Sequence, residues 1–245
     1  MRTLAIIGGT GLTQLDELEV LESKWLDTPF GEPSAALTFG RIDGKDVVFL
    51  ARHGDPHQIP PHKINYRANM SALKQAGVTQ IIAVNAVGGI HASLGPAEVA
   101  IPDQIIDYTY GREHTIYDAS SSDLDHIDFT FPYSQSVRSL LLTSADKAGV
   151  DILDGGTYGA TQGPRLESAA EISKYKRDGC DLVGMTGMPE ASLAREFDID
   201  YACLALSVNW AAGLNDSIIT MDDIHQAIEQ GMGNIHKILK AFLMT

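Results

Sequence analysis

The chain has 245 residues, of which 44% are hydrophobic and 20% charged, as is usual for a globular protein. Its formal net charge of −14 disfavours binding to nucleic acid or to an anionic membrane, because no run of Lys or Arg offsets the acidic residues. No stretch approaches the roughly 18 apolar residues of a membrane span. Cys180 and Cys203 lack metal-ligand spacing, so a reducing cytoplasm is the expected location.

The first predicted element is a buried parallel strand over residues 4–7, a continuous apolar run. It leads into Gly8-Gly9-Thr10-Gly11, where glycines let backbone N–H groups approach an anion and Thr10 adds a hydroxyl donor. A dinucleotide fingerprint would need a third glycine where the chain has Gln14, and no P-loop Gly-Lys-Ser/Thr follows. The turn is therefore interpreted as a binding site for a small phosphate.

Residues 35–42 and 45–51 flank Asp43-Gly44 and predict a β-hairpin. The second strand runs directly into Arg52 and His53. Arginine offers a planar fork of donors to an oxyanion, and His53 can add another donor. Because sites in α/β folds favour the ends of buried strands, this pair is a second candidate anion site; a solvated turn is the alternative.

The middle of the chain predicts a helix over residues 65–76 and a strand over residues 80–86 that ends in Asn85 and Ala86. These two residues repeat the arrangement at the first strand and are candidates for the same ligand. Residues 99–107 read as an edge strand interrupted by proline. Residues 110–132 form a polar segment, which we expect to be functional or mobile. Its histidines lack metal-type spacing, as do the others, so no metal is predicted.

The remaining chain predicts helices alternating with strands, ending in a long helix with one apolar stripe. A single α/β domain over residues 1–245, with a mixed central β-sheet flanked by helices, is therefore expected. The expected helices and strands cover residues 134–148, 156–160, 169–177, 182–183, 199–207 and 221–243.

A short stretch between a predicted strand and a predicted helix combines Met185 with Thr186. The helix should start at Pro189-Glu190, since proline is tolerated in a first turn and an acid suits the positive end of the dipole. A hydroxyl beside a soft apolar side chain can hold an anion and an apolar group together. An ordinary strand-to-helix turn is the alternative reading.

Five stretches occur in one order over nearly the whole chain: Gly8-Gly9-Thr10-Gly11, Arg52-His53, Asn65-Tyr66-Arg67-Ala68-Asn69, Gly163-Pro164-Arg165 and Met185-Thr186-x-x-Pro189-Glu190. Each alone is weak, but the ordered set resembles the trimeric branch of the purine nucleoside phosphorylase and methylthioadenosine phosphorylase family. The resemblance implies a phosphorolytic enzyme and a homotrimer with sites near subunit interfaces. Inorganic phosphate would be a co-substrate, and no cofactor is expected.

The same resemblance implies a role for individual residues. The sugar would lie beside Met185, and the base contacts would fall on Asn209 and Glu167, which would stabilise the departing purine. Trp210, Ala211 and Asp222 complete the predicted substrate site. The predicted phosphate site consists of Thr10, Arg52, His53, Asn85, Ala86 and Thr186.

Two departures from the methylthioadenosine pattern bear on the base. The amino group of adenine is a hydrogen-bond donor, which carboxylates at positions 209 and 211 would accept, but this chain has Asn209 and Ala211 there. An asparagine amide can accept from protonated N7 and donate to a carbonyl O6, and Glu167 can accept from the N1–H of a 6-oxopurine. An unmatched buried group costs about 1–3 kcal/mol, or roughly tenfold in discrimination, so 6-oxopurines are expected over adenine.

The sugar end is predicted from the overall resemblance to the methylthio branch, with Asp222 standing near a position that is apolar in that branch. S-methyl-5′-thioinosine is therefore the expected substrate. The alternatives are a methylthioadenosine phosphorylase, a general 6-oxopurine nucleoside phosphorylase, a nucleosidase that uses water, and a nucleoside-binding protein without turnover. A nicotinamide dehydrogenase is disfavoured by Gln14.

Overall fold

A mixed β-sheet of eleven strands forms the centre of the computed structural model, which describes residues 3–9, 12, 18–118, 124–216 and 218–245. Along one path the strands are ordered β2-β3-β4-β1-β5-β10-β9-β7, and β11, β6 and β8 branch from β5. The strands are β1 (Leu4–Gly8), β2 (Glu19–Lys24), β3 (Leu37–Ile42), β4 (Lys45–Ala51), β5 (Gln80–Gly89), β6 (Val99–Ile101), β7 (Gln104–Asp107), β8 (Ile152–Asp154), β9 (Thr157–Ala160), β10 (Leu182–Gly184) and β11 (Asp200–Trp210).

Strand β5 is the element on which the sheet divides. Its first half pairs in parallel with β1, its last residues pair antiparallel with β10, and β11 accompanies it in parallel over its whole length. Because β1, β4, β5 and β11 run in the same direction, the segments that follow β1, β4 and β11 leave the sheet at one edge. The second half of β5 extends past the end of β1 and brings Asn85 and Ala86 to this edge.

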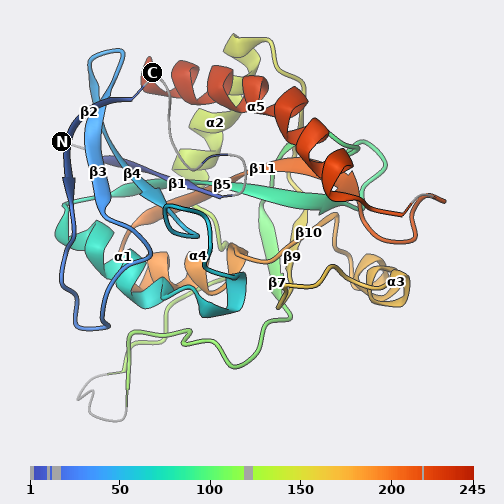
Figure 1. Cartoon of the computed structure of the whole chain (residues 1–245), viewed down its shortest axis with the longest axis horizontal. Helices are drawn as coiled ribbons and strands as arrows, with labels where there is room; N and C mark the ends of the chain where they lie inside the picture. The colour runs from blue at the N-terminus through green and yellow to red at the C-terminus, as the bar shows by residue number, and fades with distance from the viewer. Residues whose placement is uncertain (1–2, 10–11, 13–17, 119–123, 217) are drawn as a thin grey trace.

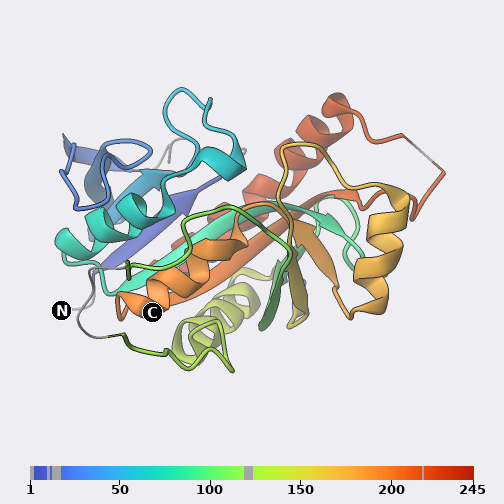
Figure 2. The same ribbon diagram turned by 90° about the horizontal axis from the view of Figure 1, so that it is seen from below.

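The helices cover both faces of the sheet. Helices α2 and α5 lie on one face of the central strands and α1 and α4 on the other, while α3 lies beside β9 and β10 (Figures 1 and 2). The connection from β7 to α2 passes over α4, where Thr115 and the backbone of Ile116 donate to Glu196. The helices are α1 (Tyr66–Gln75), α2 (Gln135–Ala148), α3 (Ala169–Arg177), α4 (Gly187–Glu196) and α5 (Met221–Leu243), with a short 3₁₀ turn at Pro61–Lys63.

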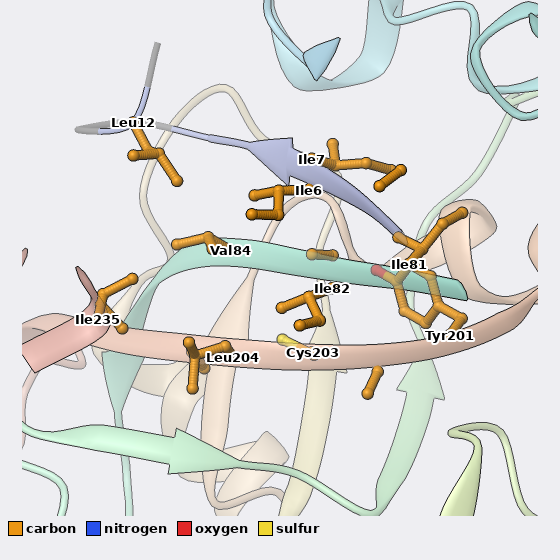
Figure 3. Packing of buried hydrophobic residues seen from close by; sticks show 14 of the residues in the cluster. Ile6, Ile7, Leu12, Ile81, Ile82, Val84, Tyr201, Cys203, Leu204 and Ile235 are labelled. Atoms are coloured by element: carbon orange, nitrogen blue, oxygen red, sulfur yellow. The ribbon is translucent and has the colours of Figure 1, made fainter. Parts of the chain in front are cut away.

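The main core lies between β1, β5 and β11 and the helices on either face. Ile6, Ile82 and Leu204 come from three neighbouring strands and are fully buried, and Ile235 of α5 packs onto the same cluster (Figure 3). These strands are apolar on both faces because helices cover both, which explains their uninterrupted hydrophobic runs.

Local sequence signals account for most boundaries. Asp43 and Gly44 both adopt positive φ (49° and 77°), as the tight hairpin between β3 and β4 requires. Asn65 accepts from the backbone N–H of Ala68 and caps α1, and Thr220 caps α5 in the same way. Ser168 and Glu171 form a capping box that starts α3.

The predicted mixed α/β fold is confirmed, with the hairpin and all five predicted helices. The prediction was incomplete in three places. Strand β2 is exposed at every residue and β8 has three residues, so neither has a readable apolar pattern. The single edge strand predicted over residues 99–107 is two strands, β6 and β7, separated at Pro102-Asp103. No helix in the described part of the chain is long and apolar enough to cross a membrane.

Candidate active site

A cavity of about 250 Å³ opens at the edge where the central strands end. Its walls come from segments that are distant in the sequence but adjacent in the sheet, together with the start of α5. The lining residues are Gly9, Arg52, His53, Pro61, Ala86, Val87, Gly88, Pro164, Leu166, Glu167, Val183, Gly184, Met185, Thr186, Val208, Asn209, Met221 and Ile224.

Arg52 is fully buried at the end of β4 and forms a two-pronged ion pair with Glu190 of α4. Its Nε and Nη2 donate to the two carboxylate oxygens at 2.6 and 2.8 Å. Burial alone would lower the pKa of the guanidinium, but the Glu190 carboxylate outweighs this effect and the pKa is raised. Arg52 is therefore charged, and Glu190 balances that charge inside the protein.

His53 is buried beside Arg52 and stacks on His57, with the ring centroids 4.4 Å apart. Burial and the positive charge of Arg52 lower the pKa of His53 to about 4, so the ring is neutral near pH 7. Its Nδ1 lies 2.8 Å from the carbonyl oxygen of Ile59 and must hold the proton. The other nitrogen, Nε2, is then an acceptor, so the expectation that His53 adds a donor holds only for the protonated ring.

Asn85 links Arg52 to Thr186. Its Oδ1 accepts from Arg52 Nη2 at 3.3 Å, and its Nδ2 donates to Thr186 Oγ1 at 2.8 Å. The hydroxyl hydrogen of Thr186 is thereby left for another acceptor. Asn85 itself is not among the cavity-lining residues and lies behind Thr186, whereas Ala86 lines the cavity.

Met185 lines the cavity next to Thr186 and lies against Gly163. Gly163 has a φ of 61°, and a Cβ placed there would be 2.4 Å from the Met185 sulfur. Both the backbone conformation and the contact therefore favour glycine. The predicted order of strand, Met185-Thr186 and helix is observed. Regular helical geometry begins at Glu190, because Met188 and Pro189 are non-helical.

Asn209 and Glu167 line the cavity from two different segments. The Asn209 amide donates one hydrogen to the Trp210 carbonyl oxygen at 2.7 Å, which leaves its second hydrogen and its oxygen for other partners. Thr161 donates to Oε1 of Glu167 at 2.6 Å and holds that carboxylate. Asn209 lies beside Gly88 of β5. Gly88 is three residues after Asn85, which places the two roughly 10 Å apart at 3.3 Å per residue.

Three predicted substrate residues are not among the cavity-lining residues. Trp210 borders two other depressions, Ala211 is buried in a small apolar cluster, and Asp222 is exposed. On the first turn of α5 the lining residues are Met221 and Ile224, on either side of Asp222. The geometry therefore supports an apolar wall here rather than a carboxylate. The predicted phosphate ligand Thr10 lies outside the described residues.

Sequence reasoning missed three residues that organise the site. Glu190 enters the sequence analysis only as a helix start and as part of one of the five resembling stretches, and its ion pair with Arg52 is not predicted. Thr161 holds Glu167, and Arg112 donates to the backbone of Met185; neither has a recognisable sequence signal. In the described part of the chain no cluster of three His, Cys, Asp or Glu could hold a metal, and the absence of a metal stays a prediction.

Known proteins resemble this chain over its whole length. The model of the phosphorylase superfamily matches residues 3–244. A probable S-methyl-5′-thioinosine phosphorylase from Pseudomonas syringae pv. tomato is 52% identical, with 99% of each chain covered. A 6-oxopurine nucleoside phosphorylase from Pyrococcus furiosus is 42% identical, with 98% of this chain and 92% of that protein covered. Methylthioadenosine phosphorylase from Schistosoma mansoni in complex with adenine has a TM-score of 0.94 at 29% identity, with 100% and 91% covered.

The substitution Glu190→Gln should strongly destabilise the protein, because it leaves the buried Arg52 charge without its anion. Breaking one partner of a buried pair costs about 3–5 kcal/mol, which urea denaturation would measure as a lower free energy of unfolding. The control Glu229→Gln, on the exposed side of α5, should change it by less than about 0.5 kcal/mol. Similar effects of the two substitutions would contradict the assigned role of the pair.

The stability of the protein should fall as the pH is lowered from about 6.5 to about 4, because the unfolded chain then binds a proton at His53 that the folded protein excludes. In His53→Gln this fall should be smaller. Urea denaturation at several pH values measures it, with His225→Gln on the exposed side of α5 as the matched control. The same pH dependence in wild type and His53→Gln would show that His53 does not contribute.

Proposed function

The chain belongs to the phosphorylase superfamily, and from this premise we propose that it cleaves S-methyl-5′-thioinosine with inorganic phosphate. The products would be hypoxanthine and 5-methylthioribose 1-phosphate. The observation that carries the proposal is that Asn209 and Glu167, the two candidates for reading the base, line the same cavity as Arg52, Thr186 and Met185.

Phosphate would bind at the end of the cavity formed by Arg52, His53, Ala86 and Thr186. The Thr186 hydroxyl, free to donate because Asn85 occupies its oxygen, would bind a phosphate oxygen directly. Four of the five N–H groups of the Arg52 guanidinium already donate to Glu190, Asn85 and the Val84 carbonyl oxygen. Arg52 would therefore give the phosphate at most one further hydrogen bond, and Glu190 balances most of its charge. We also retain Thr10 as a proposed phosphate ligand.

In the proposed reaction a phosphate oxygen attacks C1′ while the bond from C1′ to purine N9 breaks. The electron pair of that bond moves into the purine, whose N7 takes up a proton from solvent, while hydrogen phosphate releases its own proton as it becomes the sugar ester, so that the net transfer is from phosphate to purine. The sugar, beside Met185, passes through a transition state with positive charge at C1′, and the enclosed phosphate anion stabilises this charge. Asn85, at the proposed phosphate end, and Gly88, beside Asn209 at the proposed base end, are roughly 10 Å apart along β5. This separation leaves room for a phosphate and a nucleoside in line.

The proposed base preference rests on the free groups of Asn209 and Glu167. One amide hydrogen of Asn209 remains to donate to O6, and its oxygen remains to accept from the protonated N7. Glu167 would accept from N1–H. Adenine has an amino group in place of O6 and no hydrogen at N1, so two contacts would be unmatched.

The proposed preference for a 5′-methylthio group rests on Met221 and Ile224, which line the cavity at the start of α5. A thioether fits such a wall, whereas a 5′-hydroxyl would lose its hydrogen bonds there. The names of the similar proteins support both halves of the substrate: one is a probable S-methyl-5′-thioinosine phosphorylase and another a 6-oxopurine nucleoside phosphorylase. The second name also favours inosine as the alternative substrate.

We further propose a single catalytic domain over residues 1–245, a cytoplasmic homotrimer and a reaction that needs no cofactor or metal. The family resemblance supports the trimer, as do large apolar side chains exposed on the connection from β7 to α2, namely Tyr110 and Phe131. The two cysteines of the chain are free and buried, which suits a reducing compartment.

The proposed reaction predicts that hypoxanthine is released from S-methyl-5′-thioinosine only when phosphate is present. At saturating phosphate, kcat/KM should decrease from S-methyl-5′-thioinosine to inosine, and S-methyl-5′-thioadenosine should be a poor substrate. Chromatographic detection of the free base measures all three. Release without phosphate would indicate a nucleosidase, and stabilisation by ligands without any release would indicate a binding protein.

The substitution Asn209→Asp should shift the preference towards adenine, because a carboxylate accepts from the 6-amino group and from protonated N7 but cannot donate to O6. We expect the ratio of kcat/KM for S-methyl-5′-thioadenosine to that for S-methyl-5′-thioinosine to rise about tenfold. Ala211 should be left unchanged, since an added carboxylate would be buried among apolar side chains. Asn215→Asp, outside the cavity lining, is the control. An unchanged ratio in Asn209→Asp would refute this account of base recognition.

A further inference from the structure

Arg112 lies in the polar segment that follows β7, yet its side chain is buried. Its guanidinium donates to Tyr66 on α1 (3.2 Å), to the carbonyl oxygens of Met185 (2.9 Å) and Met188 (2.6 Å), and to those of Thr161 (3.2 Å) and Gln162 (2.9 Å). The Nε–H donates to the side chain of Gln162 at 3.2 Å. One planar group therefore binds three segments of the chain at once.

Two of these segments supply the walls of the cavity. The first contains Met185 and Thr186, and Arg112 holds the carbonyl groups on both sides of Thr186. The second contains Thr161, whose hydroxyl holds the Glu167 carboxylate. Arg112 itself is not among the cavity-lining residues. From outside the cavity lining, Arg112 thus connects the wall proposed to contact the sugar and the phosphate, Met185-Thr186, to the wall proposed to contact the base, Glu167.

The bonding of Arg112 differs from that of the other buried arginines. Arg52 pairs with Glu190 and Arg138 pairs with Asp154. Within the described residues, no carboxylate forms an ion pair with Arg112, and its partners are carbonyl groups, an amide and a phenol. A planar fork is needed to reach acceptors in several directions, and the single ammonium of lysine cannot reproduce it.

We propose that Arg112 is a positioning residue that fixes the distance between Met185-Thr186 and Glu167. This inference rests on the proposed function, because it concerns how the two ends of the nucleoside are held for the same reaction. A misplacement of about 1 Å at such a site can reduce the rate on the order of 100-fold. Positioning would explain why this buried cation forms no ion pair with a carboxylate of the described residues.

The kinetic test compares Arg112→Met and Arg112→Lys with Arg138→Met. Arg138 is similarly buried and also donates to backbone carbonyls, those of Ile101 and Pro102, but neither it nor these partners line the cavity. We expect kcat for S-methyl-5′-thioinosine to fall on the order of 100-fold in both Arg112 variants. In Arg138→Met, stability should fall and kcat should stay within about twofold, as expected for a purely structural arginine.

Hydrogen exchange provides a readout that does not depend on activity. In Arg112→Met, amide exchange should become faster in both segments 161–167 and 185–188, and in Arg138→Met in neither. If wild type shows no phosphorolysis while this exchange pattern holds, the proposed function fails and the positioning role stands. If Arg112→Met does not fold, Gln162→Leu provides the test, because it removes the side-chain acceptor of the Arg112 Nε–H and of the Tyr110 backbone N–H but leaves the guanidinium in place. It should lower kcat about threefold and speed exchange in the same segments.

Three results would overturn the proposal. The first is a kcat close to wild type in Arg112→Met. The second is recovery of kcat in Arg112→Lys, which would mean that the positive charge alone is sufficient. The third is faster exchange in only one of the two segments, because Arg112 would then not couple them.

Discussion

The buried ion pair between Arg52 and Glu190 is the interaction on which the rest of the site depends. It joins the end of β4 to α4, and Tyr201 of β11 donates to the same carboxylate at 2.8 Å. Removing the two charges from water costs several kcal/mol each, and only close two-pronged bonding offsets this cost. The pair therefore fixes α4, and with it Thr186, relative to the sheet before any ligand binds.

The division of the sheet at β5 explains why a cavity forms at this place. Where β1 ends, β5 continues and exchanges its neighbour for the antiparallel β10, so the strands separate and polar side chains fill the opening. Asn85 lies at this point and bonds to both Arg52 and Thr186. The same change of neighbour thus creates the opening and supplies the residue that orients its donors.

Sequence alone predicted the elements with a strong period and the residues at strand ends. The apolar runs of β1, β5 and β11 and the stripe of α5 could be read because burial imposes them. The exposed strand β2 could not, since solvent accepts any residue there. At the site, Arg52 and Thr186 follow strands and were identified from that position. Arg112 donates hydrogen bonds to groups 46 to 76 positions away in the sequence, and Thr161 donates to Glu167, 6 positions away. Contacts of this kind leave no trace in local sequence patterns.

The neutral ring of His53 has a consequence for the choice between anions of similar shape. Its Nδ1–H is occupied by the Ile59 carbonyl, so Nε2 offers a lone pair. A hydrogen phosphate ion carries an O–H group that can donate to this lone pair. Sulfate near neutral pH carries no O–H group, so one of its oxygens would face Nε2 with no hydrogen between the two acceptors. At the proposed phosphate site, a tetrahedral dianion would thus be recognised by its proton as well as by its charge. In a chain with a net charge of −14, this chemistry would distinguish one oxyanion from another without a surplus of positive residues.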